Sequence, residues 1–245
     1  MTPYRGPVNS PTERDDEPAR ARSLRRPQLG AESASYVRDL IVAGRLHGGD
    51  FIRPEAIALE LGISSTPVRE GLLALHAQGF VRLVPRRGFM VLPLTGDDVR
   101  DLFAGQALLA GELAARAVKR CDATTLAEIE KLQEALEDAA SQGAREELEE
   151  LNHQFHRAVN LMAGAPKIAW LLGVAVSYVP VRFYSTIEGW PAATVHDHRE
   201  ILDAFRRGAS RNARTAMSEH IMHSGELLAL HIERSAETAE DPASP

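Results

Sequence analysis

The chain has 245 residues, 44% of them hydrophobic and 25% charged, which is ordinary for a globular protein of one or two domains. No stretch approaches the ~20 apolar residues that span a bilayer, and the N-terminus lacks the apolar core of a signal peptide. We therefore expect a cytoplasmic protein. The single cysteine, Cys121, excludes an intramolecular disulfide and a multi-cysteine zinc site.

The net charge of −6 is unevenly distributed along the chain. Residues 1–95 carry 13 Lys and Arg against 10 Asp and Glu, whereas residues 96–245 carry 15 against 24. This asymmetry favours contact between a polyanion and the front part alone, although six of the 13 positive charges fall within the first 26 residues.

The first 94 residues predict a tail followed by a small mixed domain. Residues 1–28 are rich in Pro, Arg, Ser and acidic side chains, so a disordered tail is predicted there. From Ser33 apolar residues recur at helical spacing, and Gly44 marks the end of a first helix. The run PEAIALELG predicts a short second helix that ends at Gly62.

A third helix and a hairpin complete this domain. In STPVREGLLALHAQG, Thr66 suits the N-cap, Pro67 the first helical position and Gly79 the C-terminal end. The run FVRLVPRRGFMVLPL alternates about Pro85–Gly88 and predicts a β-hairpin. Three short helices, a glycine-containing turn between the second and third, and a hairpin describe a winged helix-turn-helix over residues 29–94.

The remainder of the chain shows only helical periodicity. We expect helices near 96–120, 123–141, 144–163, 165–188, 192–208 and 211–233. The predicted fold class is therefore mainly α: a winged helix-turn-helix followed by a six-helix antiparallel ligand-binding domain over 95–235. Residues 236–245 are predicted to form a flexible tail.

The third helix is the candidate reader of double-stranded DNA. A major groove admits one helix, whose N-terminal residues reach base edges and phosphates. Hydroxyls and free backbone N–H groups at a helix start suit a phosphate oxygen. A hairpin tip would touch the DNA backbone or the minor groove. The predicted DNA-binding residues are Ser64, Ser65, Thr66, Arg69, Arg86, Arg87 and Gly88.

The histidine spacing of the second domain predicts a metal site. Asn152 and His156 are four residues apart and share a helix face. His198 and His220 are equally far from the turn at 208–210, so in an antiparallel helix pair they lie at the same height. If all face inward, three imidazoles and one amide oxygen would bind a divalent transition metal, with zinc or nickel expected, and leave positions open for water or a ligand.

Two stretches of the chain resemble a known family. Tyr36 to Val91 resembles the DNA-binding domain of the GntR transcriptional regulators, whose usual form is close to S-R-T-P-V-R-E-A-L followed by a wing with a P-x-R-G tip. LNHQFHRAVNLMAG and HDHREILDAFRRGASRNARTAMSEHI resemble the all-helical effector-binding (FCD) domain of the FadR-type branch. That resemblance implies a metal held by Asn152, His156, His198 and His220.

The chain departs from the family pattern at three places. Ser65 stands where an arginine that contacts DNA is usual, and Gly71 stands where alanine is usual, which predicts a looser recognition helix. The family often has an arginine in R-x-x-L-E that helps hold an acidic effector, but this chain begins that motif with Gln106. The candidate effector-binding residues are therefore Gln106, Arg182, Tyr184 and His223.

The resulting prediction is a metabolite-responsive repressor, not an enzyme. We expect a homodimer that binds a pseudo-palindromic operator and a small effector, with sugar acids, dicarboxylates and aromatic acids as the classes that the resemblance suggests. One alternative is a metal-dependent enzyme, because three histidines with an open position also describe catalytic zinc. Another is a winged helix that serves as a protein-interaction module with a structural metal.

Overall fold

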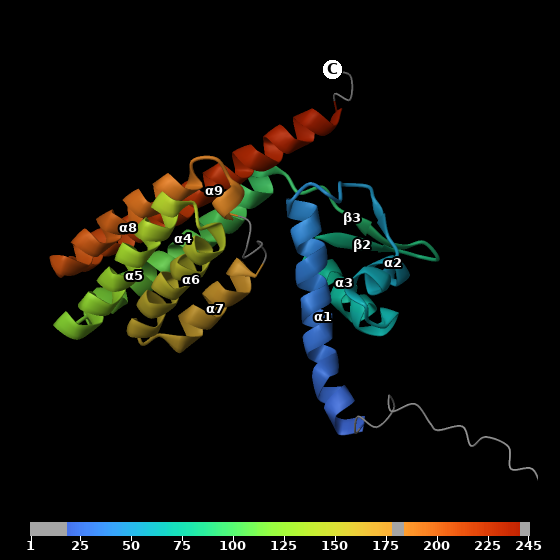
Figure 1. The fold of residues 1–245 in the computed structure, drawn as a ribbon, viewed down its shortest axis with the longest axis horizontal. Helices are drawn as coiled ribbons and strands as arrows, with labels where there is room; N and C mark the ends of the chain where they lie inside the picture. Colours follow the sequence, from blue (N-terminus) through green and yellow to red (C-terminus); the bar gives the residue numbers. More distant parts are fainter. Residues whose placement is uncertain (1–18, 178–183, 241–245) are drawn as a thin grey trace, which may run out of the picture.

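The computed structural model describes residues 19–177 and 184–240, which form a small mixed domain and a larger helical domain (Figure 1). The small domain consists of α1 (Ala19–Val42), β1 (Phe51–Ile52), α2 (Pro54–Leu61), α3 (Ser65–Ala77), β2 (Val81–Val84) and β3 (Gly88–Val91). The larger domain consists of α4 (Gly96–Val118), α5 (Ala123–Gln142), α6 (Arg145–Met162), α7 (Pro166–Val176), the 3₁₀ turn η1 (Tyr184–Thr186), α8 (Trp190–Arg206) and α9 (Ser210–Glu240). The predicted fold class is confirmed.

The wing is the predicted hairpin with one additional strand. The sheet is antiparallel in the order β1-β3-β2, and the hairpin register pairs Val81 with Val91. In β1, Phe51 pairs with Met90, and this strand was not predicted. Two residues are too few to show an alternating pattern, so β1 exists through its pairing with β3 and not through a local signal.

The start of α3 differs from the prediction by two residues. Ser64, with an extended backbone, is the N-cap, so the assignment of Thr66 as the cap is wrong. Pro67 is accommodated in the first turn because the N–H groups there have no intrahelical partner. Gly62 adopts a left-handed conformation at φ 65° after α2, as its predicted role as a helix end requires.

The terminal helices are longer than predicted. α1 begins at Ala19 and α9 continues to Glu240, so residues 19–28 and 236–240 are helical where tails were expected. These stretches contain several strong helix formers, chiefly Ala, Arg and Glu, which the compositional prediction of disorder undervalued. The remaining tail residues lie outside the described part of the chain.

The predicted helix 165–188 is also wrong in its second half. α7 ends at Val176, and Tyr184–Thr186 forms a separate 3₁₀ turn. Pro180 follows within a few residues of the end of α7, and a proline can neither donate an intrahelical hydrogen bond nor leave its predecessor in the helical region.

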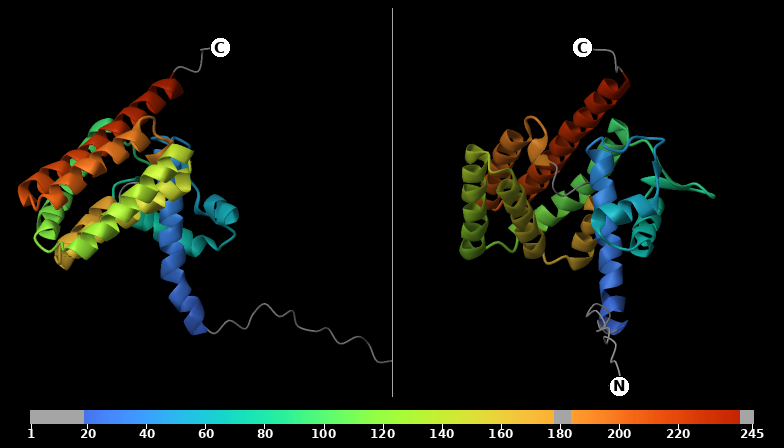
Figure 2. Two further views of the ribbon diagram at one scale, coloured as in Figure 1. Left: turned by 60° about the vertical axis from the view of Figure 1, so that its left-hand side comes forward. Right: turned by 45° about the vertical axis from the view of Figure 1, so that its right-hand side comes forward.

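The domains meet through a shared apolar core. α4 packs along α9, and α9 extends past the bundle toward the small domain (Figures 1 and 2). One buried cluster contains Val42 of α1, Val99 and Phe103 of α4, and Leu228 of α9. Within the described residues, no helix combines the length and apolar character needed to cross a membrane.

Candidate DNA interface and metal centre

The predicted DNA-reading end of α3 is accessible. Ser64, Thr66 and Arg69 are exposed, while Ser65 is partly buried. The Nη2 atom of Arg69 lies 2.7 Å from Oε1 of Glu55 on α2. This exposed ion pair is weak in water, so it holds the guanidinium in place without preventing its exchange for a phosphate or a base.

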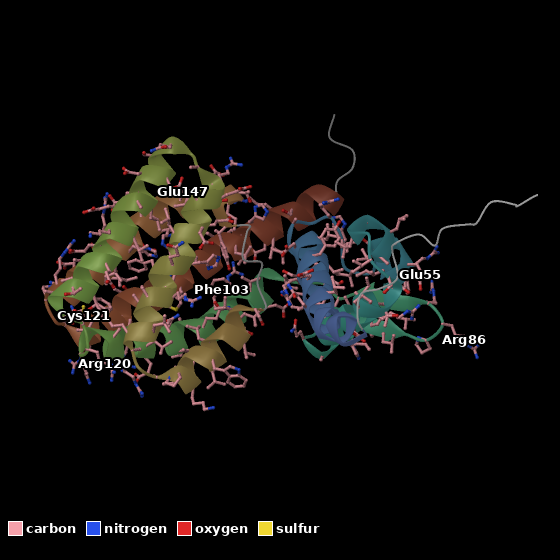
Figure 3. All side chains as sticks on the ribbon, turned by 60° about the horizontal axis from the view of Figure 1, so that its bottom comes forward. Glu55, Arg86, Phe103, Arg120, Cys121 and Glu147 are labelled. Atoms are coloured by element: carbon pink, nitrogen blue, oxygen red, sulfur yellow. The ribbon has the colours of Figure 1, made fainter. Side chains whose placement is uncertain are left out.

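The tip of the wing presents two further cations. Arg86 has φ 62°, an uncommon conformation for a residue other than glycine, and it projects at the far end of the molecule (Figure 3). Arg87 lies over the ring of Phe51, 4.2 Å from its centroid. Gly88 has φ 97°, and a Cβ there would lie 2.9 Å from the carbonyl oxygen of Ile52. The hairpin therefore needs this glycine to pair with β1.

Gly71 has a packing role that the sequence did not reveal. It lies where α3 crosses α1, and a Cβ on it would come 2.6 Å from the carbonyl oxygen of Gly30 and 2.9 Å from the amide nitrogen of Ala34. The predicted looser helix is therefore not the whole effect of this glycine. Its absent side chain is what allows α1 and α3 to approach closely.

The helical domain brings together the three histidines predicted from spacing. His156 comes from α6, His198 from α8 and His220 from α9, and one ligand atom of each lies within 4.8 Å of the others. The Nε2 atoms of His156 and His220 are 3.2 Å apart. Two nitrogens bound to one zinc ion at ~2.0–2.1 Å are about 3.0–3.4 Å apart, so this spacing fits a shared cation.

Two neighbouring side chains orient the histidine rings. Nδ1 of His198 lies 3.0 Å from Oε1 of Gln133 on α5, and Nδ1 of His220 lies 3.3 Å from Oδ2 of Asp197 on α8. An Nδ1–H that donates to an oxygen leaves Nε2 as a lone-pair donor, the state in which imidazole binds a metal. Sequence reasoning missed both partners, because neither Gln133 nor Asp197 shares a helical face pattern with the histidine it orients.

Burial keeps two of the three histidines neutral. It lowers the pKa of His156 and of His198 well below the ordinary value, and in each case the charge of His220 adds to the effect. Burial alone would raise the pKa of the Asp197 carboxyl, but hydrogen bonds to His220 and His223 outweigh it and lower the pKa to about 2. The site thus pairs two neutral imidazoles with an ionised carboxylate behind them.

Two buried atoms of this cluster have no hydrogen-bond partner among the described residues. They are Nε2 of His198 and Oδ1 of Asn152, which lies one turn before His156 on α6. Buried acceptors of this kind are normally satisfied. A cation coordinated by His156, His198, His220 and Asn152 would satisfy both, so the donor set fits a divalent transition metal.

A cavity of about 410 Å³ adjoins the histidines. Asn152, His156 and His220 line it, whereas His198 lies behind them, fully buried and stacked on Phe155 with ring centroids 4.0 Å apart. A cation held here would therefore be reachable from the cavity. Buried clefts of this size are typical of small-ligand sites.

The four candidate effector residues differ in their position relative to the cavity. Gln106 and Tyr184 line the cavity, and Nε2 of Gln106 donates to the carbonyl oxygen of Ala175 at 3.2 Å. His223 is not among the lining residues, because its half-exposed ring turns to Asp197 at 3.0 Å. Arg182 lies outside the described residues.

Other cavity residues were not identified from the sequence. His153, Arg157 and Asn160 form one stripe of α6 that lines the cavity, at the i, i+4, i+7 spacing that could have revealed them. His153 lies off the helix face that Asn152 and His156 share, yet it still lines the cavity. Phe103 also lines the cavity and belongs to the buried cluster that contains Val42 of α1.

Comparison with known families matches both domains. Residues 31–91 match the family described as "Bacterial regulatory proteins, gntR family", and residues 101–223 match the family described as "FCD domain". The two matched segments coincide with the winged helix and with the helical domain that contains the three histidines.

Individual relatives are similar over most of the chain. A "Probable D-xylose utilization operon transcriptional repressor" from Paenarthrobacter nicotinovorans is 32% identical over 77% of this chain and 85% of its own. The HTH-type transcriptional regulator BphR from Paraburkholderia xenovorans is 30% identical over 80% and 78%. The solved structure of McbR/YncC from E. coli has a TM-score of 0.64 at 21% identity, covering 83% of this chain and 98% of that one, and supports the fold alone.

Proposed function

The chain belongs to the GntR family of bacterial regulatory proteins and carries an FCD domain, and from this premise we propose that it is a metal-dependent, metabolite-responsive repressor. That it is a transcriptional regulator, and not an enzyme, follows from the family. The observation that carries the finer proposal is the 3.2 Å approach of His156 and His220 at the wall of the cavity.

The metal would be held by Asn152, His156, His198 and His220. When bound, it supplies a Lewis-acidic position that an effector carboxylate can occupy. Three nitrogens and one amide oxygen favour zinc or nickel over the harder magnesium and calcium ions. The chain's own part is to fix the rings through Gln133 and Asp197 and to exclude water behind them, where Phe155 covers His198.

The DNA contacts would come from the start of α3 and from the wing. Ser64, Ser65, Thr66 and Arg69 would enter the major groove, and Arg86, Arg87 and Gly88 would follow the backbone beside it. Effector binding would reach this surface through Phe103, which lines the cavity and shares a buried cluster with Val42 of α1. A coupling free energy of about 1–3 kcal/mol is typical of such regulation.

We propose a homodimer on a pseudo-palindromic operator, with α7 at the interface. The inner face of α7 lines the cavity through Leu172 and Val176, yet Trp170, Leu171 and Val174 on its outer face are also exposed and apolar. A helix that is apolar on all sides is normally covered on all sides. A second copy of this chain would cover the outer face, as the two-fold symmetry of such regulators requires.

Metal content and DNA binding test the proposal together. Protein purified without an affinity tag should contain about one transition metal per chain, and the His156→Ala/His198→Ala variant should contain none. The wild-type protein should also bind DNA from its own promoter region, with affinity that falls as salt rises. Deletion of the gene should raise expression of a promoter reporter, and a fall would refute repression.

Two results would contradict parts of this proposal. Absence of metal from the wild-type protein would leave the histidines as pocket residues only. Failure to bind promoter DNA at low salt would favour the protein-interaction module. The enzyme reading has no support from the site, because no Asp or Glu is among the lining residues of the cavity in the described part of the chain.

A further inference from the structure

The cavity beside the histidines has walls of two different characters. One wall is the α6 stripe of His153, Arg157 and Asn160 next to Asn152 and His156. The opposite wall is apolar and comes from α4, α7, η1, α8 and α9: Phe103, Ala110, Leu172, Val176, Tyr184, Trp190 and Ile221. Gln106 of α4 and Ser224 of α9 also line the cavity, but Gln106 already donates to the carbonyl oxygen of Ala175. The other polar lining groups lie on α6 or, as His220 does, beside His156, so a ligand that fits should be polar mainly at one end.

The charge of the lining favours an anion. Arg157 is the only Lys or Arg among the lining residues that the structure describes, and no carboxylate accompanies it there. Its guanidinium has no hydrogen-bond or ion-pair partner in the described part of the chain. An arginine left unpaired at a cavity without acidic residues is suited to a carboxylate of the ligand. It stands on α6 directly beside His156.

The apolar wall is held rigidly by aromatic packing. Tyr184 stacks on Trp190 with centroids 5.5 Å apart, and Phe103 meets Tyr184 edge-on at 6.4 Å. The buried Glu149 carboxylate accepts the backbone N–H of Ser185 at 2.9 Å and so fixes η1. Burial raises the pKa of Tyr184, so its phenol stays neutral. A flat apolar body can pack against this wall, but a hydroxyl or second carboxylate facing its aliphatic part would lose its hydration.

We infer that the effector is a monocarboxylate with an apolar, ring-sized body, and that Arg157 is a specificity-determining residue that selects its charge. This inference rests on the proposed effector site at the cavity. It separates the three carboxylate classes that the sequence left open, because sugar acids and dicarboxylates carry polar groups at both ends. The carboxylate would lie at the α6 wall, where Arg157 adjoins the proposed metal site, and the body would lie between Phe103, Tyr184 and Trp190.

Isothermal titration of the full-length, metal-loaded protein with four probes tests the inference. Phenylacetate should bind, and its uncharged analogue phenylacetamide, gluconate and succinate should each bind at least tenfold more weakly. In Arg157→Gln the preference for the acid over the amide should fall at least tenfold while metal content is unchanged. Arg145→Gln removes an exposed charge from the same helix outside the cavity and should leave the preference intact.

Three outcomes would overturn the inference: gluconate or succinate binding as tightly as phenylacetate, an unchanged acid-over-amide preference in Arg157→Gln, or no heat from any probe at millimolar concentration. Failure of the proposed metal-dependent repressor function would give different results from failure of this inference. Loss of promoter binding or of metal in the wild-type protein would contradict the regulatory site as proposed, whereas selective binding of phenylacetate would still establish the ligand class.

Discussion

Nδ1 of His198 lies 3.0 Å from the amide oxygen of Gln133, and both side chains are buried. Gln133 is itself held by hydrogen bonds from its Nε2 to Glu137 and to the carbonyl oxygen of Val195. This network fixes which atom of Gln133 faces the ring, and hence which nitrogen of His198 is left for a metal. Gln133 therefore affects the affinity for a metal although it is not itself a metal ligand.

We expect Gln133→Leu to lower metal affinity by roughly 10–100-fold, as loss of an outer-shell partner of a metal-bound histidine usually does. Zinc titration in competition with a chromophoric chelator measures this directly. Gln154→Leu makes the same change on the exposed surface of α6 and should leave affinity unaltered. Equal zinc affinity in Gln133→Leu and wild type would show that His198 needs no such orientation.

Replacing either of two glycines at the crossing of α1 and α3 by alanine should change the free energy of unfolding, but in opposite directions. Gly71→Ala places a Cβ 2.6 Å from the carbonyl oxygen of Gly30, so it should lower the free energy of unfolding by about 1–3 kcal/mol despite alanine's helix propensity. Gly30→Ala meets only ordinary contacts at 3.6 Å and should raise it by about 0.5–1 kcal/mol.

Denaturant unfolding followed by circular dichroism measures both variants. The comparison is internal, because the two positions belong to the same crossing and receive the same side chain. A stabilised Gly71→Ala would mean that the two helices can separate without cost, and the close approach would then have no part in positioning α3.

Features with a local sequence signal are predicted better than those that arise from tertiary packing. Periodicity, turns and matched spacing predict the winged helix and the meeting of His156, His198 and His220, since each depends on local pattern or on one antiparallel turn. The orienting contacts of Gln133 and Asp197, and the close approach of Gly30 and Gly71, depend on residues brought together by tertiary packing. β1 is likewise set by tertiary pairing with β3. The end of α7 is different, because the proline beyond Val176 is a local signal that the apolar pattern obscured.

The outer face of α7 predicts the effect of a charge on assembly. Trp170→Glu puts a carboxylate into the proposed dimer interface and should weaken association by about 2 kcal/mol or more, as loss of an interface tryptophan commonly does. This corresponds to a rise in the dimer Kd of roughly thirtyfold. Sedimentation velocity across micromolar concentrations measures it.

Leu59→Glu is the matched control for assembly, because Leu59 is highly exposed but lies on α2 of the small domain. It should leave the dimer Kd unchanged. A wild-type protein that sediments as a monomer throughout would refute the homodimer, and an unaffected Trp170→Glu dimer would place the interface on another face.

Arg86 and Arg69 should affect DNA binding in different ways. Arg86, at the wing tip, is placed for phosphate, so Arg86→Ala should weaken binding to promoter and unrelated duplexes alike and reduce the salt slope by about 1. Arg69 is exposed in the first turns of α3, so Arg69→Ala should weaken promoter binding by about 1–3 kcal/mol and unrelated DNA less.

Fluorescence anisotropy with both duplexes at several salt concentrations separates these effects. Arg207→Ala removes an exposed charge beyond the end of α8, in the helical domain, and should change neither affinity nor slope. If Arg69→Ala lost affinity equally for both duplexes, Arg69 would be a phosphate contact. The specificity of α3 would then have to come from the hydroxyls at its N-terminus and from the shape of the DNA.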